Sequence, residues 1–230
     1  DRLAWRSHLL ASLGRLVDAD LGSAGEMRGC RSLRVADLGV THWMQPGLFD
    51  PALIDAAMRE FRSDPARTPI LLDYFRRDPL ADGLCLARTD LMGDLDWYAS
   101  DDYQIIYRPC GLDPILWCFR PIPFSRVDDN AGVILARAKG RPRFGARERL
   151  IVREAHAAIA ALIGRSLARF DEPSPRDLAP RVRQVLACLL EGDGDKQIAA
   201  RLSMSQYTVN QYTKTIFQHF GCRSRSELLA

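Results

Sequence analysis

The sequence predicts two domains: an α+β domain with an antiparallel sheet and flanking helices over residues 1–170, and an all-α domain over residues 178–230. Strand-like and helix-like segments are mixed in the first range, whereas the second holds only short amphipathic helices separated by small polar turns. Residues 171–177 contain two prolines, which a helix does not continue through, so we expect a linker there. With 230 residues and 47% hydrophobic composition, the chain is large enough to bury a core in each domain.

The α+β domain is expected to open with a helix over residues 2–17, because its leucines fall roughly on one helical face. Residues 21–31 are typical of a turn-rich stretch. Residues 33–43 have the β-branched and apolar content of a strand, although Gly39 interrupts it.

A second helix is expected over residues 51–62, because Asp50 can cap it and Pro51 suits its first position. Residues 113–123 and 130–138 then predict two neighbouring strands from their alternating and buried apolar patterns.

The domain is expected to close with a long helix over residues 145–170, which carries an apolar stripe. Such a helix can pair with its copy, so we expect a homodimer joined through it. The acidic segment 94–102 is interpreted as a solvated loop, because its spacing does not match a calcium loop.

Several kinds of function are not supported by the residue patterns. Six scattered cysteines and four separated histidines form no zinc spacing, so we expect no metal and no cofactor. The chain has no phosphate-binding or dinucleotide glycine loop and no nucleophile motif, which predicts a protein without catalytic activity. No apolar run is long enough to span a bilayer, and with no sign of a secretory signal we expect a cytoplasmic protein without membrane contact.

The last part of the chain has the pattern of a helix-turn-helix. Residues 180–190 and 196–202 predict two helices, broken apart by Gly192 and Gly194. Ala199 is small, as a steep helix crossing requires. Residues 203–205 then predict the turn, whose last residue is a serine that can cap the next helix.

The helix after that turn is expected to present a polar face without carboxylates. Its outward row comprises Tyr207, Asn210, Gln211, Lys214 and Gln218. Asn and Gln can bind adenine in the major groove and Lys can bind guanine, which predicts a partner of double-stranded DNA. Tyr207 and Gln218 are equally compatible with simple solvation. The residues expected to contact DNA, by base, phosphate or helix cap, are Lys196, Ser205, Tyr207, Thr208, Asn210, Gln211, Lys214, Arg223 and Arg225.

The net charge of +3 lies entirely in this last part of the chain. From residue 176 onward there are eight basic residues and five acidic ones, an excess of three. Because this equals the net charge of the whole chain, the charges of residues 1–175 cancel. A polyanion-binding module needs such an excess, although three charges support only weak affinity.

The C-terminal residues resemble the LuxR-type (GerE-like) helix-turn-helix family over the whole of 178–230. The matching positions are Leu178, Pro180, Arg181, Val185, Leu186, Gly192, Lys196, Ile198, Ala199, Leu202, Ser205, Thr208, Val209, Ile216, Gly221 and Arg225. The resemblance implies a bacterial transcription regulator whose four-helix domain puts its third helix into the major groove, usually as a dimer. Ala179 and Val182 depart from it, because they replace the capping box that opens the first helix, at a cost of about 1 kcal/mol.

The first domain resembles the GAF/PAS-like sensory domains that precede such readers, around residues 97–111 and the strands that follow. This resemblance implies a small-molecule effector. The candidate ligand-binding residues are Trp97, Tyr98, Tyr103, Tyr107, Trp117 and Phe119, since aromatic walls with polar handles suit small ligands. An ordinary aromatic core is the alternative for each of them.

Two other functions stay open at this point. The first domain can be a ligand-binding or enzymatic GAF-like module whose helical tail does not read DNA. Alternatively, the tail can be a helical bundle that binds a protein partner.

Overall fold

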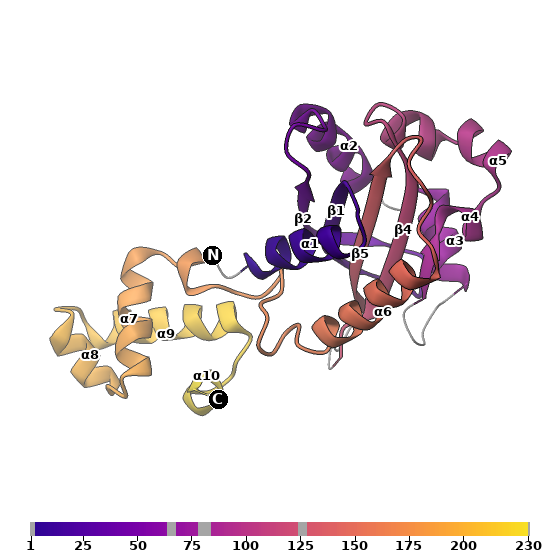
Figure 1. Ribbon diagram of the computed structural model, residues 1–230. Coiled ribbons are helices and arrows are strands. Elements are labelled where there is room, and N and C mark those ends of the chain that lie inside the picture. Colours follow the sequence, from indigo (N-terminus) through magenta and orange to yellow (C-terminus); the bar gives the residue numbers. More distant parts are fainter. Residues whose placement is uncertain (1–2, 64–67, 78–83, 124–127, 230) are drawn as a thin grey trace. The chain divides into compact units, whose positions relative to one another are not determined.

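The computed structural model describes residues 3–63, 68–77, 84–123 and 128–229. The chain divides into two compact units, Asp1–Asp171 and Glu172–Ala230 (Figure 1). Each unit has a core of its own, and each is described separately below.

The first unit is built on a five-stranded antiparallel sheet in the order β2-β1-β5-β4-β3. Its strands are β1 (Leu21–Arg28), β2 (Ala36–Met44), β3 (Cys85–Ala87), β4 (Leu112–Pro121) and β5 (Asp129–Ala138). The predicted strands at residues 113–123 and 130–138 are confirmed as β4 and β5.

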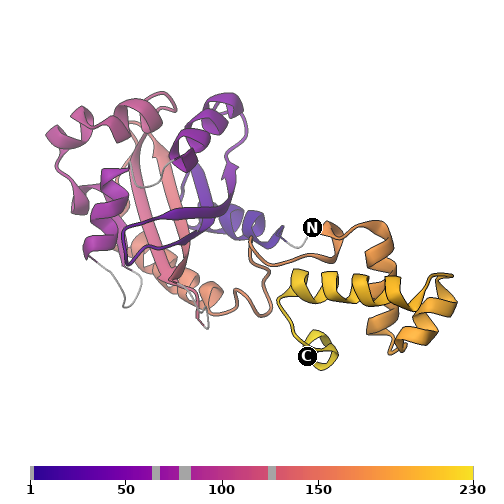
Figure 2. The same cartoon turned by 180° about the vertical axis from the view of Figure 1, so that it is seen from behind.

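Helices cover both faces of this sheet, which gives three layers (Figures 1 and 2). One face packs against α1 (Trp5–Leu16) and α6 (Ala146–Ala160) through a core that includes Leu10, Leu13, Leu135 and Val152. The other face packs against α2 (Pro51–Ser63), α3 (Pro69–Arg77), α4 (Arg88–Leu91), α5 (Asp94–Ala99) and the π-helix η2 (Asp102–Tyr107). The predicted α+β domain, with an antiparallel sheet and flanking helices, is thus confirmed.

The prediction of a turn-rich stretch at residues 21–31 was wrong, because most of it is the central strand β1. Its small residues suggested turns, but alternate positions of the strand face opposite sides of the sheet and are buried on both. Gly25 lies directly opposite Gly132 of β5. A glycine inside a strand often marks a site where a ligand or another part of the chain approaches the backbone closely.

Strand β2 begins three residues later than predicted and contains an irregularity beside Gly39. Gly39 has a φ of +149°, and a Cβ at this position would lie 2.4 Å from Cδ1 of Phe170. The ring of Phe170 therefore packs directly on the backbone of the outer strand, and only glycine leaves room for it.

The long closing helix predicted over residues 145–170 was also wrong in its second half. Helix α6 ends at Ala160, and the chain turns through Gly164, whose φ is +78°. Gly164 N donates to the carbonyl of Leu167, which closes this turn. The apolar stripe continues in the sequence, but the helix has already ended at Ala160, and the turn that follows uses the left-handed conformation that glycine favours.

The acidic segment 94–102 is not a loop, because α5 and the start of η2 occupy it. Asp94 pairs with Arg88 and Arg143. Asp102 is only 2% exposed and accepts a hydrogen bond from Ile70 N at 3.1 Å. The carboxylates thus cap and pair with neighbouring elements, and the solvated-loop interpretation fails for Asp102.

The second unit is all helical, as predicted. Its elements are the 3-10 turn η3 (Pro175–Asp177), α7 (Pro180–Leu190), α8 (Asp195–Arg201), α9 (Gln206–Phe220) and the short α10 (Arg225–Leu229). Val185, Leu189, Ile198, Val209 and Ile216 are fully buried at the centre of its core.

The start of α7 lacks a side-chain cap at Ala179, in agreement with the sequence. A reciprocal box forms further upstream. Ser174 Oγ accepts from Arg176 N, and Asp177 Oδ2 accepts from Ser174 N at 3.1 Å. His219 Nε2 lies 2.9 Å from the Ser174 carbonyl oxygen, so residues expected to form a linker are fixed to α9.

Candidate functional site

The turn between α8 and α9 holds the two helices at a fixed angle. Ser203 adopts a left-handed conformation with a φ of +52°, and Met204 N donates to the Ala199 carbonyl at 3.0 Å. Ser205 Oγ then accepts from Thr208 N at 3.1 Å, which caps α9. Ser205 and Thr208, both predicted at the DNA interface, thus bond to each other at the beginning of α9.

One face of α9 is exposed and carries only neutral polar groups and a cation. Asn210, Gln211, Lys214 and Gln218 are exposed, and Tyr207 is 73% exposed. The opposite face is anchored by the fully buried Val209 and Ile216. No Asp or Glu occurs in α9, so nothing on this helix repels a phosphate backbone.

The basic residues of the second unit differ in what they contact. Lys196 and Lys214 are exposed, and neither forms an ion pair with any residue that the structure describes. Arg201 pairs with Glu191 and Asp193, which neutralises its charge. The two lysines are therefore more available to a polyanion than Arg201.

The two predicted phosphate-binding arginines near the end of the chain also differ. Arg223 is exposed, and only its backbone is bonded, to Glu227. Arg225 is partly buried, and its Nη2 donates to the carbonyls of Leu189 and Asp193. Arg225 thus ties α10 to the end of α7, where a cation also suits the helix dipole.

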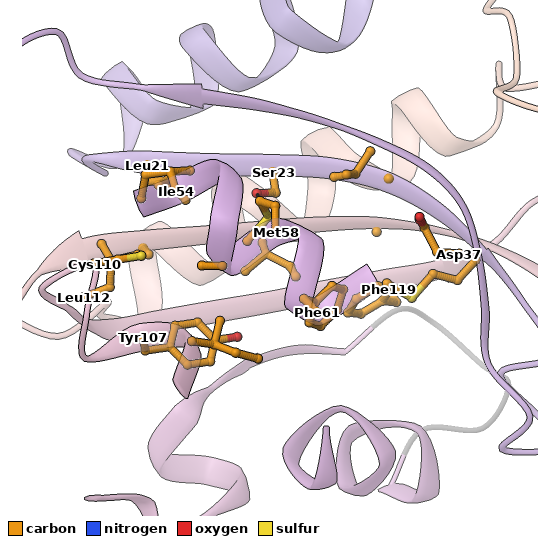
Figure 3. Close-up of a pocket in the computed structure, with 18 residues that line it drawn as sticks. Leu21, Ser23, Asp37, Ile54, Met58, Phe61, Tyr107, Cys110, Leu112 and Phe119 are labelled. Carbon is orange, nitrogen blue, oxygen red and sulfur yellow. Dashed lines mark hydrogen bonds between the residues drawn. The ribbon is translucent and has the colours of Figure 1, made fainter. Parts of the chain in front are cut away.

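The first unit contains an apolar cavity between the sheet and α2, shown in Figure 3. Its lining comes from β1, β2, β4, β5, α2 and η2, and includes Leu21, Ser23, Met27, Ile54, Ala57, Met58, Phe61, Cys110, Phe119 and Ile134. The volume of the cavity is about 40 Å³, little more than the roughly 30 Å³ that one water molecule takes up in the liquid. A larger guest requires the lining to rearrange.

Few polar groups reach this cavity. Ser23 Oγ lies 3.8 Å from the Met58 sulfur, which leaves its hydroxyl only a weak partner. Burial raises the pKa of Tyr107 above its usual range, so the phenol stays neutral and can donate or accept a hydrogen bond. Asp37 lies at the edge and is paired with Arg62. These groups can orient a mainly apolar molecule.

The six predicted ligand-binding aromatics divide into two groups. Tyr107 and Phe119 line the cavity. The others, Trp97, Tyr98, Tyr103 and Trp117, pack with Tyr107 as successive ring pairs behind it, with centroids 4.9–6.4 Å apart.

Asp113 fixes the polar ends of two of these rings. It accepts from Trp97 Nε1 at 3.2 Å and from the Tyr98 hydroxyl at 2.6 Å. The bond to Asp113 raises the pKa of Tyr98 to about 12. The indole N–H of Trp97 and the hydroxyl of Tyr98 are therefore already hydrogen-bonded within the protein.

Sequence reasoning missed the lining residues on β1 and α2. The signal was present in residues 21–27, where Leu21, Ser23, Gly25 and Met27 alternate, but the small residues favoured a turn. Gly132 lies beneath the Phe119 ring, where a Cβ would come within 2.2 Å of Phe119 Cε1. Gly25 and Gly132 therefore line the cavity on the sheet side, where a side chain at Gly132 would clash with Phe119.

The described parts of the chain contain neither a cluster of metal-ligand side chains nor a helix that could span a membrane. No group of three or more His, Cys, Asp or Glu side chains is placed there to hold a metal ion. Among the same residues, no helix combines the length and the apolar character needed to cross a bilayer.

Comparison with solved structures gives similar proteins at low identity. SdiA in complex with octanoyl-rac-glycerol has 15% identity and a TM-score of 0.49, covering 97% of this chain and 86% of that one. SdiA of Escherichia coli has 17% identity and a TM-score of 0.43, covering 95% and 84%. A GAF domain/HD domain protein from Geobacter sulfurreducens has 18% identity and a TM-score of 0.39, covering 68% and 87%.

No curated protein matches the chain by sequence. A family model, described as bacterial regulatory proteins of the luxR family (GerE), matches residues 176–230. The match spans η3 and the helices α7 to α10, including the capped turn and the polar face of α9. Residues 176–230 of this chain thus form a GerE domain, the type described for the luxR family of bacterial regulatory proteins.

Proposed function

We propose that this protein is a cytoplasmic, non-enzymatic transcription regulator that binds duplex DNA as a homodimer and is controlled by a small apolar effector. The observation that carries the proposal is the exposed, carboxylate-free face of α9 within a luxR-family domain. Its amides and its one lysine suit base edges in the major groove.

The residues proposed to contact bases are Asn210, Gln211 and Lys214, with Tyr207 beside them. Lys196, Thr208 and Arg223 are proposed to contact phosphates, which position a reader without specifying sequence. Ser205 contributes through the cap of α9, and we assign Arg225 a role in holding α10. The small positive excess predicts modest affinity for one copy, so two copies on paired half-sites are needed for stable binding.

The effector is proposed to occupy the cavity between the sheet and α2. A mainly apolar lining with the hydroxyls of Ser23 and Tyr107 suits a small, largely hydrocarbon molecule that carries one or two polar atoms. Met27 and Met58 have flexible side chains that can move to enlarge the space.

DNA reading is tested with a duplex selected from a random pool. Asn210→Ala and Lys214→Ala are each expected to weaken binding about 5- to 150-fold, because a good base contact contributes about 1–3 kcal/mol. Gln184→Ala removes an exposed amide from α7 and serves as the matched control, with unchanged affinity expected. Equal affinity of all four proteins, each folded by circular dichroism, would refute the assignment of α9.

Effector binding is tested by organic extraction of the purified protein and mass spectrometry. We expect a co-purifying small molecule in the wild type and its loss in Ala57→Leu, which fills the cavity from α2. Leu53→Ala, on the exposed side of the same helix, is the control. An identical extract from the wild type and Ala57→Leu would argue against this cavity.

Dimer formation is tested by the molar mass in light scattering with and without the selected duplex. A monomer mass at every concentration, both free and on DNA, would overturn the proposed dimer.

A further inference from the structure

Two cysteines face each other on the side of the sheet that lies away from the cavity. Cys85 on β3 is directly paired with Cys118 on β4. Opposed residues of antiparallel strands point to the same face. Phe119 lines the cavity, so its neighbour Cys118 points the other way, toward α6.

The strand register brings the two thiols within reach of a covalent bond. Directly opposed residues in antiparallel strands have Cα atoms about 4.5–5.5 Å apart. Disulfides span Cα separations of about 4.4–6.8 Å, so this register needs no movement of the backbone to form one. In the described strands no other cysteine lies opposite a cysteine.

The surroundings of the pair favour a negative charge on Cys118. His156 of α6 places its Nδ1 3.3 Å from Cys118 Sγ, in a fully buried contact. The hydrogen bond from Cys85, followed by the contact with His156, lowers the pKa of Cys118. Because Cys118 takes the charge, the pKa of Cys85 rises.

Three arginines add positive potential around the two sulfurs. Arg120 acts on Cys118, and Arg149 and Arg153 act on Cys85. Reactive cysteines typically occur in such electropositive surroundings. Cys30, by contrast, is buried near Asp128 and Asp129, and its burial raises the pKa of its thiol.

We propose that Cys85 and Cys118 form an oxidisable dithiol site that hydrogen peroxide converts into a cross-strand disulfide, with His156 as the positioning residue. The Cys118 thiolate attacks one peroxide oxygen, so an S–O bond forms, the O–O bond breaks and hydroxide leaves. The Cys85 thiol protonates that hydroxide to water. The resulting Cys85 thiolate attacks the Cys118 sulfur, and a second hydroxide leaves and takes a proton from solvent.

Access to the pair comes from the edge of the sheet. β3 is an edge strand of three residues, and Cys85 is partly exposed, whereas Cys118 is fully buried. A small oxidant can therefore reach the pair past Cys85, while bulky thiol reagents should label Cys85 and leave Cys118 unlabelled. This chemistry is independent of the effector cavity and of DNA reading.

The test uses the full-length, reduced protein treated with hydrogen peroxide, then alkylated and digested without reductant. We expect a peptide pair linked through Cys85 and Cys118, lighter by two hydrogen atoms than the free peptides and released by dithiothreitol. Cys222 is also partly exposed and has no opposed cysteine, so Cys222→Ser should form the same link at the same rate.

Variants separate the steps of the reaction. Cys85→Ser should leave Cys118 as a sulfenic acid, which dimedone traps when the peroxide-treated protein is denatured in its presence. His156→Asn should slow linking about tenfold in protein that remains folded by circular dichroism. The proposal is overturned if the wild type, which needs no substitution, shows no link between these two cysteines under conditions that oxidise Cys222. It is also overturned if His156→Asn forms the link at the wild-type rate.

Discussion

At the scale of single residues, buried charges in this protein are held by particular partners. Asp102 is an example, because it is almost fully buried and accepts a hydrogen bond from the backbone N–H of Ile70. Desolvation, with the nearby charges of Asp101 and Asp73, raises its pKa to about 6. A carboxyl group that holds its proton more tightly when folded makes stability fall as the pH rises through that value.

Asp102→Asn is therefore expected to stabilise the first unit at pH 8 by on the order of 1–3 kcal/mol, since the buried charge is removed. The difference between the variant and the wild type should shrink as the pH falls from about 7 to about 4, where Asp102 is protonated in both folded and unfolded chains. Urea unfolding of both proteins across this pH range measures the difference in stability. Asp101→Asn, at an exposed neighbour that only adds to the raised pKa of Asp102, should show a much smaller trend. A wild type as stable as Asp102→Asn at pH 8 would contradict the prediction.

Arg225→Ala is expected to destabilise the second unit by about 1–2 kcal/mol, because two carbonyls at the end of α7 lose a charged donor. Arg223→Ala, which removes an exposed side chain, should stay within about 0.5 kcal/mol of the wild type. Thermal unfolding, monitored by circular dichroism, gives the melting temperatures of the two variants. Equal melting temperatures for the two variants would show that Arg225 is free for another role.

At the scale of elements, periodicity predicted well where one face of an element is buried. The strands β4 and β5 and the helices α1, α2, α7, α8 and α9 follow from their apolar spacing. It failed where conformation depends on contacts distant in sequence. The small residues of β1 form a strand because strands lie on both sides of it, and α6 ends at Ala160 although its apolar stripe continues.

The candidate sites also differ in whether local apolar spacing could predict them. The polar face of α9 was predictable, because it is the complement of one buried helical face. The cavity was not, since its walls come from six elements and its floor from opposed glycines. Only Tyr107 and Phe119 among the predicted aromatics line it, because aromatic residues equally serve as core.

The caps of α7 and α9 provide a matched pair of tests. Ser205→Ala should cost about 1 kcal/mol by removing the bond to Thr208 N. Ala179→Ser should stabilise the unit by about 0.5–1 kcal/mol, because α7 has no side-chain cap and Ala179 already has an extended ψ of 149°. Chemical denaturation of both variants gives the two values. Opposite signs are expected, and a loss of stability in Ala179→Ser would mean that the added hydroxyl finds no donor.

At the scale of the whole molecule, the chain consists of two units that each close their own core. The buried residues of the second unit, from Leu178 to Ile216, form one core cluster with partly buried members of the same unit. Its capping contacts, including that between His219 and Ser174, also lie within residues 172–230.

A fragment of residues 172–230 is therefore expected to fold alone, with helical circular dichroism and a cooperative thermal transition. A fragment that begins at residue 178 lacks Ser174 and should melt at a lower temperature. Absence of a cooperative transition in the longer fragment would show that the second unit depends on the first.

The two margins of the sheet bear on how copies of this protein can associate. Unpaired strand edges recruit other chains, and natural proteins counter this with very short edge strands, bulges and charged residues. Here β3 is three residues long, and β2 is irregular at Gly39, covered by Phe170 and charged through the Asp37–Arg62 pair. Sheet extension between copies is thus disfavoured at both margins, as it is in natural proteins that avoid edge-to-edge aggregation.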